Sequence, residues 1–274
     1  MCSRIFRYQG IVTGWGPSLS RADTGGGCRT RFEDARGRRG VAGQVLLGAL
    51  ARNDVWYGGR TNNPWNLNEG SSGSSAGSAS ATAAGLCGFS IGTETLGSIM
   101  SPSQRCGTTG LRPTFGRVSR RGAMVLAATL DKVGPICRAV EDTAMVLSAL
   151  NGVDPDDRGS ISAPFHSTPT RASTTCASAI CRRRSAIGRP PSTAEPWRPC
   201  RARLHGRRDR LARSAYDALR HILIAEAAAN FEDLTFSDRD ELLTVQTDEA
   251  WPNTFRRARF LSARITCNST SCDT

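Results

Sequence analysis

Apolar residues recur at regular spacing in several stretches of this chain. The run FSIGT at 89–93 is apolar and ends in a glycine turn, which predicts a short buried strand. The small residues of 76–86 predict a tightly packed helix that ends at Gly85. Residues 140–152 and 216–234 have apolar side chains at helical spacing and predict amphipathic helices. The stripe of the first of these helices comprises Val140, Ala144, Leu147 and Leu150.

These patterns divide the chain into five segments. Residues 41–165 and 215–263 are well patterned, whereas 1–40, 166–214 and 264–274 show no sustained period. The pattern is lost abruptly at the borders, and the unpatterned segments have an excess of Arg, Pro, Ser and Cys. We therefore expect these three segments to be translated out of frame or to come from a damaged gene. If the frame is correct, we expect the middle one to be disordered.

The positive charge of the chain is concentrated in one of the unpatterned segments. The chain has 274 residues, 39% of them hydrophobic, and a net charge of +12. Residues 171–213 carry twelve arginines against Glu195 and Asp209, so this stretch holds ten of the twelve net charges. Basic segments can bind nucleic acid, but Trp197 is the one aromatic residue within this stretch that could stack on a base. A disordered tract is the better interpretation, and a nucleic-acid partner is the weaker one.

Composition also limits the compartment and the cofactors. No stretch of about 18 apolar residues occurs, so we expect no membrane span. The ten cysteines include no CxxC pair and no Cys/His cluster with zinc spacing, which indicates free thiols and no metal site. Free thiols are typical of a reducing compartment, and the start of the chain lacks a signal-peptide pattern. We therefore expect a cytoplasmic protein.

The segment 41–165 carries an ordered series of Gly- and Ser-containing motifs. Gly73-Ser74-Ser75 opens the series, and Ser98 follows 24 residues after Ser74, within GTETLGSI. Further motifs follow in order: Gly110-Leu111-Arg112-Pro113-Thr114, Gly116-Arg117-Val118-Ser119, Leu130-Asp131, Val133-Gly134-Pro135 and Val140-Glu141-Asp142. This series resembles the amidase signature family over the whole of 41–165. The helical segment 215–263 is similar to a later part of the same family.

The resemblance implies a fold and a chemistry. The fold is an α/β fold with a mixed sheet flanked by helices, which we expect to be incomplete in this chain. The activity is hydrolysis of a carbon–nitrogen amide bond through an acyl-enzyme, without a metal or organic cofactor. By carry-over, Ser98 is the nucleophile and Ser74, preceded by a non-proline cis peptide bond, is the serine that relays its proton. The backbone N–H groups of the oxyanion hole belong to Thr95, Leu96, Gly97 and Ser98.

The chain departs from the family at the base of the catalytic triad. The family's lysine precedes the relay serine by several dozen residues, but the only lysine here is Lys132, which follows both serines within LDKVGP. Leu96 and Met100 stand where the family usually has a glycine and an arginine. We therefore expect weak or no turnover. An amidase with residual activity, a catalytically dead remnant and an Arg-rich nucleic-acid-binding protein all stay open.

The resemblance does not determine the substrate, and the substrate class it implies is a small-molecule amide. The family includes the A subunit of a tRNA-dependent amidotransferase. Amidotransferase partner subunits are therefore compatible with the resemblance, although no sequence feature indicates them. Gly73-Ser74-Ser75-Ala76-Gly77 also fits the G-x-S-x-G elbow of α/β-hydrolases, with Ser75 as nucleophile. The preceding PWNLNEGS has no strand pattern, which argues against that alternative. For Glu94 and Asp131, structural hydrogen bonding is favoured over a role as general acids.

Overall fold

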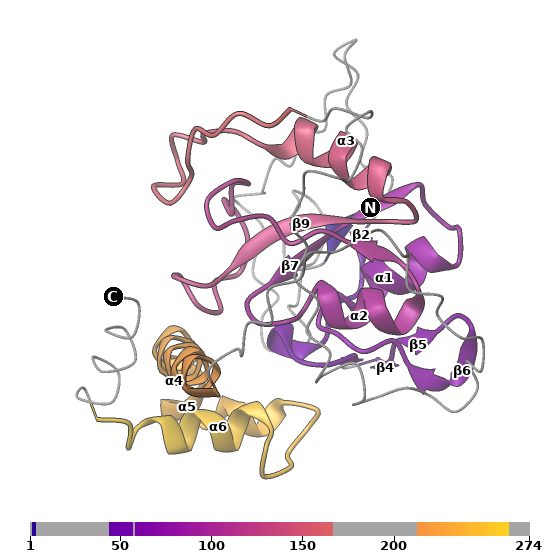
Figure 1. Ribbon diagram of the computed structural model, residues 1–274. Coiled ribbons are helices and arrows are strands. Elements are labelled where there is room, and N and C mark those ends of the chain that lie inside the picture. The colour runs from indigo at the N-terminus through magenta and orange to yellow at the C-terminus, as the bar shows by residue number, and fades with distance from the viewer. Residues whose placement is uncertain (1, 4–43, 57, 167–212, 263–274) are drawn as a thin grey trace. The chain divides into compact units, whose positions relative to one another are not determined.

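The computed structural model describes residues 2–3, 44–56, 58–166 and 213–262 (Figure 1). The unpatterned segments of the sequence lie almost wholly outside these residues, as does the arginine-rich stretch. The description that follows concerns the unit formed by residues 1–167 and 218–274.

The centre of this unit is a mixed sheet with the strand order β2-β1-β7-β9-β8 among the described residues. The long strands β7 (Phe89–Glu94) and β9 (Lys132–Cys137) pair antiparallel, from Phe89 opposite Cys137 to Glu94 opposite Lys132. Three short strands complete the sheet: β1 (Cys2–Ser3), β2 (Gln44–Val45) and β8 (Thr109–Gly110). β1 pairs parallel with both β2 and β7. The expected α/β fold with a mixed sheet is therefore confirmed.

Helices flank the sheet, as predicted: α1 (Ala76–Ala83) and α2 (Met100–Cys106) lie on one side in Figure 1, and α3 (Val140–Leu150) lies on the other. The predicted packing of α1 is confirmed. Its small residues allow a close approach, since a Cβ atom on Gly77 would lie 2.6 Å from the backbone nitrogen of Leu46. The Ser78 hydroxyl donates to the carbonyl of Ile91 at 2.8 Å, which fastens α1 to β7. The chain leaves the helix through Gly85, whose φ of +73° favours glycine.

The predicted helix at 140–152 is confirmed, but its predicted apolar stripe is only partly correct. Leu147 is buried, whereas Val140 is 66% exposed. Val140 is the first residue of α3, and the face that meets the sheet passes through Thr143 and Leu147, one turn apart. The apolar spacing therefore predicted the helix correctly. It was wrong in assigning Val140 to the buried face.

Two short hairpins precede α1. They are formed by β3 (Val55–Trp56) with β4 (Gly59–Arg60), and by β5 (Asn62–Asn63) with β6 (Asn66–Gly70). The prediction that PWNLNEGS is not a strand was wrong for 66–70. This strand is polar and mostly exposed, so it carries no hydrophobic alternation that a pattern search could detect.

The C-terminal segment is helical and contributes to the core. It contains α4 (Arg213–Asn230), α5 (Glu232–Phe236), the 3₁₀ turn η3 (Arg239–Leu242) and α6 (Trp251–Ala258). The helix predicted at 216–234 is present, with a break at Phe231 between α4 and α5. Phe255 is 1% exposed and stacks on Trp251, with ring centroids 5.0 Å apart. The Trp251 indole donates to the carbonyl of Leu50 at 2.9 Å, which ties α6 to the turn η1 (Ala49–Ala51).

Candidate active site

The strand β7 leads directly into the loop that carries the predicted oxyanion residues and Ser98. Glu94 ends the strand and is 1% exposed. One of its carboxylate oxygens accepts the backbone N–H groups of Ile99 at 2.7 Å and Met100 at 2.9 Å. The other lies 3.6 Å from the Arg112 guanidinium. Glu94 stands at the start of the loop and bonds the residues that follow Ser98 at its end. It therefore holds the two ends of the loop together.

Asp131, which directly precedes the neighbouring strand β9, holds the same loop. Its Oδ1 accepts the Thr95 hydroxyl at 2.5 Å. Its Oδ2 accepts the backbone N–H groups of Leu126 and Ala127 at 2.8 and 3.0 Å. Burial raises the pKa of Asp131, and these hydrogen bonds oppose that rise. Both carboxylates therefore make the structural hydrogen bonds that the sequence favoured for them.

The predicted oxyanion residues form one bend of the chain. Thr95 is buried, Leu96 is more than one-third exposed, and Ser98 is half-buried. Gly97 has a φ of +93°, a conformation that favours glycine. A Cβ atom there would meet no other atom within 4 Å, so the backbone conformation and not space requires glycine. The sharp bend gathers the four predicted N–H donors into a single short loop.

Ser74 lies in a turn between β6 and α1. The peptide bond between Gly73 and Ser74 is cis. Ser74 is 1% exposed, and its carbonyl accepts the backbone N–H of Gly48 at 3.0 Å. Its hydroxyl has no hydrogen-bond partner within the described part of the chain. Ser74 therefore presents a buried hydroxyl that no described residue bonds, in the position where the resemblance implies contact with a lysine.

Ser75 does not have the geometry of a nucleophile. Its side chain is fully buried, and its hydroxyl donates to the carbonyl of Thr93 at 3.0 Å. The same oxygen accepts the N–H of Thr93, also at 3.0 Å. Both hydrogen-bonding capacities of the hydroxyl are used by one residue of β7, so the G-x-S-x-G alternative with Ser75 as nucleophile is wrong.

Two hydrogen bonds join the segments that carry the two predicted catalytic serines. The N–H of Ser75 donates to the carbonyl of Ser98 at 3.1 Å. The hydroxyl groups of Ser72 and Ser101 lie 2.7 Å apart. Ser75, which follows Ser74, is therefore bonded to Ser98, and Ser72, which precedes it, is bonded to the helix α2.

Lys132 lies beside this loop but bonds neither serine. Its ammonium donates to the carbonyl of Thr95 at 3.3 Å and to that of Leu130. Burial lowers the pKa of Lys132, and the nearby Arg112 lowers it further. Within the described residues, its hydrogen bonds therefore go to backbone carbonyls.

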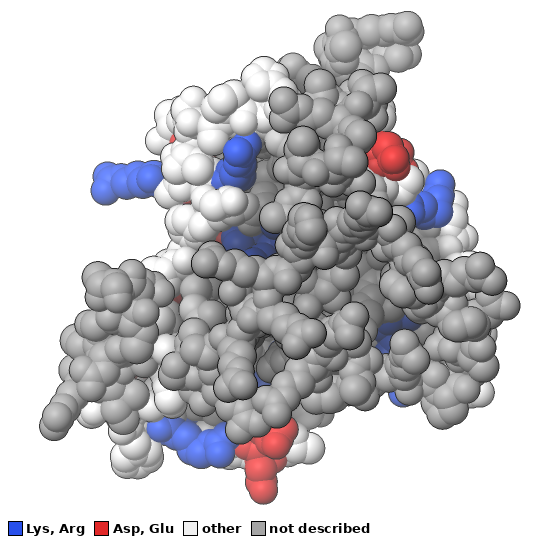
Figure 2. Space-filling model, viewed as in Figure 1, with Lys and Arg blue, Asp and Glu red and all other residues white. Residues whose placement is uncertain are grey.

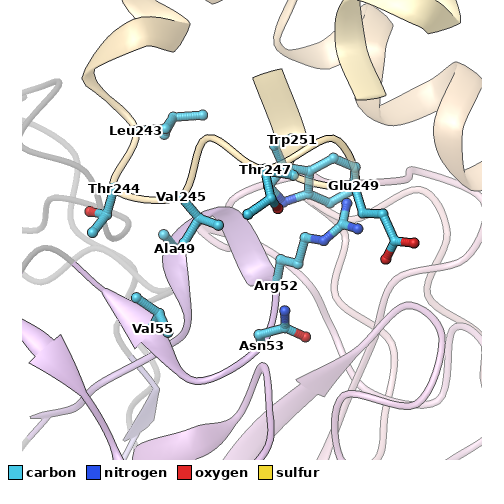
Figure 3. Close-up of a pocket in the computed structure, with 11 residues that line it drawn as sticks. Ala49, Arg52, Asn53, Val55, Leu243, Thr244, Val245, Thr247, Glu249 and Trp251 are labelled. Carbon is cyan, nitrogen blue, oxygen red and sulfur yellow. The ribbon is translucent and has the colours of Figure 1, made fainter. Parts of the chain in front are cut away.

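Two cavities flank these elements. One, of about 270 Å³, has Thr95, Asp131 and Lys132 in its wall. The other, of about 130 Å³, lies between the segment around Arg52 and the loop before α6 (Figure 3). There the Arg52 guanidinium lies 4.9 Å from the centre of the Trp251 ring. Burial lowers the pKa of Arg52, and Glu249 opposes that change.

The described residues give little sign of other chemistry. On the face drawn in Figure 2, the described Lys and Arg side chains are scattered and form no continuous patch. Within the described ranges, no group of three or more His, Cys, Asp or Glu residues could hold a metal ion. No described helix is both long and apolar enough to cross a membrane.

Sequence reasoning missed Asp54, which bonds the turn before Ser74. Its Oδ2 accepts the N–H of Ser72 at 2.9 Å. It stands in no motif, and a carboxylate that acts on a backbone amide leaves no signal in residue spacing.

Comparisons with known proteins relate this geometry to a family. A sequence profile of the Amidase family matches residues 43–205. The A-type chain of the glutamyl-tRNA(Gln) amidotransferase of Geobacillus kaustophilus is 45% identical over 135 residues, which are 46% of this chain and 28% of that protein. The corresponding chain of Listeria welshimeri is 50% identical over 108 residues, 39% of this chain and 22% of that protein. The crystal structure of an amidase family protein from Bacillus anthracis matches with a TM-score of 0.70 and 18% identity, over 98% of this chain and 60% of that one.

The matched part of the chain spans less than a third of the length of these curated relatives. At 18% identity, the likeness to the Bacillus anthracis structure shows the fold alone. The family profile, however, matches more than half of the chain and includes every predicted site residue from Ser74 to Ser98. The chain belongs to the Amidase family.

Proposed function

We propose that this site cleaves a carbon–nitrogen amide bond through a serine nucleophile. The observation that carries the proposal is the hydrogen bond from the Ser75 N–H to the Ser98 carbonyl, 3.1 Å long. It places the turn with the buried hydroxyl of Ser74 directly against the residue that would attack the substrate. Nucleophilic catalysis needs a hydroxyl and a proton acceptor in neighbouring positions.

In the proposed reaction, Ser98 Oγ attacks the amide carbonyl carbon and its proton passes to Ser74. The carbonyl oxygen becomes an oxyanion that the backbone N–H groups of Thr95, Leu96, Gly97 and Ser98 stabilise. Collapse of this intermediate breaks the carbon–nitrogen bond and releases the amine, which takes up a proton. Water then hydrolyses the acyl ester on Ser98 and frees the carboxylic acid. Glu94 and Asp131 hold the loop in shape and take no part in proton transfer.

No described residue is placed to remove the proton from Ser74. Its hydroxyl has no partner among the described residues, and Lys132 is bonded to backbone carbonyls. We therefore propose that Ser74, as it takes the proton of Ser98, passes its own hydroxyl proton to the departing amine nitrogen, and that turnover without a base is several orders of magnitude below that of a complete triad. Rapid hydrolysis of a simple amide, lost on Ser98→Ala, would contradict this proposal.

The proposed substrate is a small-molecule amide, and the proposed location is the cytoplasm. Cys87, Cys106 and Cys137 are free thiols, as is typical of proteins in a reducing compartment. The relatives are named as subunits of an amidotransferase, so an assembly with partner subunits is a further possibility for this chain. Co-purification of the tagged full chain from its own cells, followed by mass spectrometry, tests for such partners.

We also propose that residues 1–40, 166–214 and 264–274 are out of frame or come from a damaged gene. The support is the contrast in pattern between these segments and the well-patterned segments 41–165 and 215–263, while the match to the family profile continues to residue 205. Resequencing of the coding DNA tests this. Single-base insertions or deletions near the segment borders would support the proposal, and the same uninterrupted frame in independent isolates would oppose it.

A serine-reactive fluorophosphonate tests the proposed chemistry, because it reacts with an activated serine and needs no turnover. We expect slow labelling of the full chain, located to Ser98 by peptide mass spectrometry. Ser98→Ala should abolish the labelling and Ser74→Ala should slow it. Ser148→Ala is a matched control, since its hydroxyl bonds only the carbonyl of Ala144 on the exposed face of α3. If Ser98 is not labelled at all, the chain is a dead remnant of the family.

A further inference from the structure

The segment 48–54 packs against the turn that carries Ser74. The N–H of Gly48 donates to the Ser74 carbonyl at 3.0 Å. At the other end of the segment, Asp54 Oδ2 accepts the N–H of Ser72 at 2.9 Å. The turn is therefore bonded to this segment both before Ser74 and at Ser74 itself.

The contact is too close to accept side chains on the glycines of the turn. A Cβ atom on Gly70 would lie 2.0 Å from Asp54 Oδ2, and one on Gly73 would lie 1.8 Å from the carbonyl oxygen of Asn53. Both distances are far below any real contact of a Cβ atom. The glycines thus allow the Asp54 carboxylate and the Asn53 carbonyl to reach the backbone of the turn.

Ser72 connects this support to the segment of the nucleophile. It has a φ of +61°, in the left-handed region that non-glycine residues seldom adopt. The Asp54 carboxylate bonds its N–H, while its hydroxyl lies 2.7 Å from that of Ser101 in α2. A continuous path of contacts therefore leads from Asp54 through Ser72 to the helix that follows Ser98.

We infer that Asp54 is a positioning residue for the relay serine. By accepting the Ser72 N–H, it holds the turn in the conformation that directs Ser74 toward the Ser98 segment. Among the described residues, Asp54 bonds the backbone of the turn and neither catalytic hydroxyl. This role rests on the proposed function, in which Ser74 takes the proton of Ser98. Displacement of such a group by about 1 Å can cost about 100-fold in rate.

The test compares fluorophosphonate labelling of Ser98 in the full chain with that in Asp54→Ala and Asp54→Asn. Asn keeps a carbonyl oxygen that can accept the Ser72 N–H, whereas Ala does not. Glu69→Ala is the matched control, because Glu69 lies on the adjacent strand and bonds Asn66 and Arg105 but not the turn. Amide hydrogen exchange of the peptide that contains Ser72, followed by mass spectrometry, reports on the contact itself and needs no reaction.

We expect Asp54→Ala to lower the maximal labelling rate by about 10- to 100-fold without changing the probe concentration at half-maximal rate. Asp54→Asn should restore the rate to within about threefold of the parent, because neutral acceptors still bond an N–H. Glu69→Ala should match the parent. Exchange at Ser72 should accelerate in Asp54→Ala alone.

Two results would overturn the inference: labelling of Asp54→Ala at the parent rate, or an Asn variant as slow as the Ala variant. If the parent is not labelled at Ser98, the proposed function is wrong, and the hydrogen-exchange measurement then decides the role of Asp54 separately. Unchanged exchange in Asp54→Ala would overturn the positioning contact. Faster exchange in that variant alone would support it.

Discussion

Ser74 and Ser75 are adjacent and both buried, yet the structure predicts opposite results when each is changed to alanine. The Ser75 hydroxyl satisfies both the N–H and the carbonyl of Thr93. Removing it leaves two buried backbone groups without this partner, at about 1–3 kcal/mol each, so Ser75→Ala should lower the free energy of unfolding by roughly 2–6 kcal/mol. The Ser74 hydroxyl has no partner among the described residues, and removing it should change stability by less than about 0.5 kcal/mol or increase it slightly.

Urea unfolding of both variants and the parent, followed by far-UV circular dichroism, measures this difference. Each serine is the other's control, because the same hydroxyl is deleted from neighbouring positions of one turn. Equal loss of stability in the two variants would refute the reasoning, since it would show that Ser74 has a partner as good as that of Ser75. Such a result would also remove the argument that the relay serine lacks its base.

Four further predictions concern the loop, the thiols and the helical segment. Glu94→Ala should lower the free energy of unfolding by roughly 3 kcal/mol in urea titrations, because a buried and a partly buried N–H group lose a charged acceptor; a loss below about 1 kcal/mol would contradict this. Burial raises the pKa of the Cys106 thiol from 9.0 to about 12, so iodoacetamide should modify the less buried Cys87 first, and equal rates by mass spectrometry would contradict this. Because the folded pKa of Cys106 is the higher one, the stability given by its neutral thiol is complete below pH 9 and is lost as the pH rises toward 12 in alkaline unfolding titrations. Trp251→Phe should cost about 1 kcal/mol in thermal unfolding, since it removes the hydrogen bond to Leu50 and keeps the stacked ring; no loss would show that this bond contributes nothing.

The sequence predicted the elements that bury an apolar or small-residue face. The strand at 89–93, the helix at 76–86 and the helix at 140–152 are present. They were predicted from an apolar run, a stretch of small residues and helical spacing of apolar residues, respectively. The polar strand 66–70 carries no such signal and was missed. The prediction that Val140 belongs to the buried stripe of α3 was wrong. Helical spacing shows which residues share a face of the helix, but not how far along the helix that face contacts the sheet.

The candidate site shows the same division. Motif order indicated Ser74 and Ser98, and the structure brings their segments into contact through the Ser75 N–H. It could not indicate Asp54, whose carboxylate acts on a backbone amide. Nor could it show how Lys132 is used, because this depends on the pairing of β9 with β7, which brings the ammonium to the carbonyl of Thr95.

The contacts that shape the site do not depend on the missing base. The oxyanion loop is held by Glu94 and Asp131, and the turn of Ser74 by Asp54 and the Ser98 carbonyl. Each of these groups lies within the family-like segment 41–165, so this geometry can form without the lysine of the triad. In a complete triad, the lysine would accept the proton from Ser74 and would not be needed to shape the loop or the turn. The shape of the site is therefore evidence of descent from the family. The feature that bears on activity is the hydroxyl of Ser74, which has no partner among the described residues.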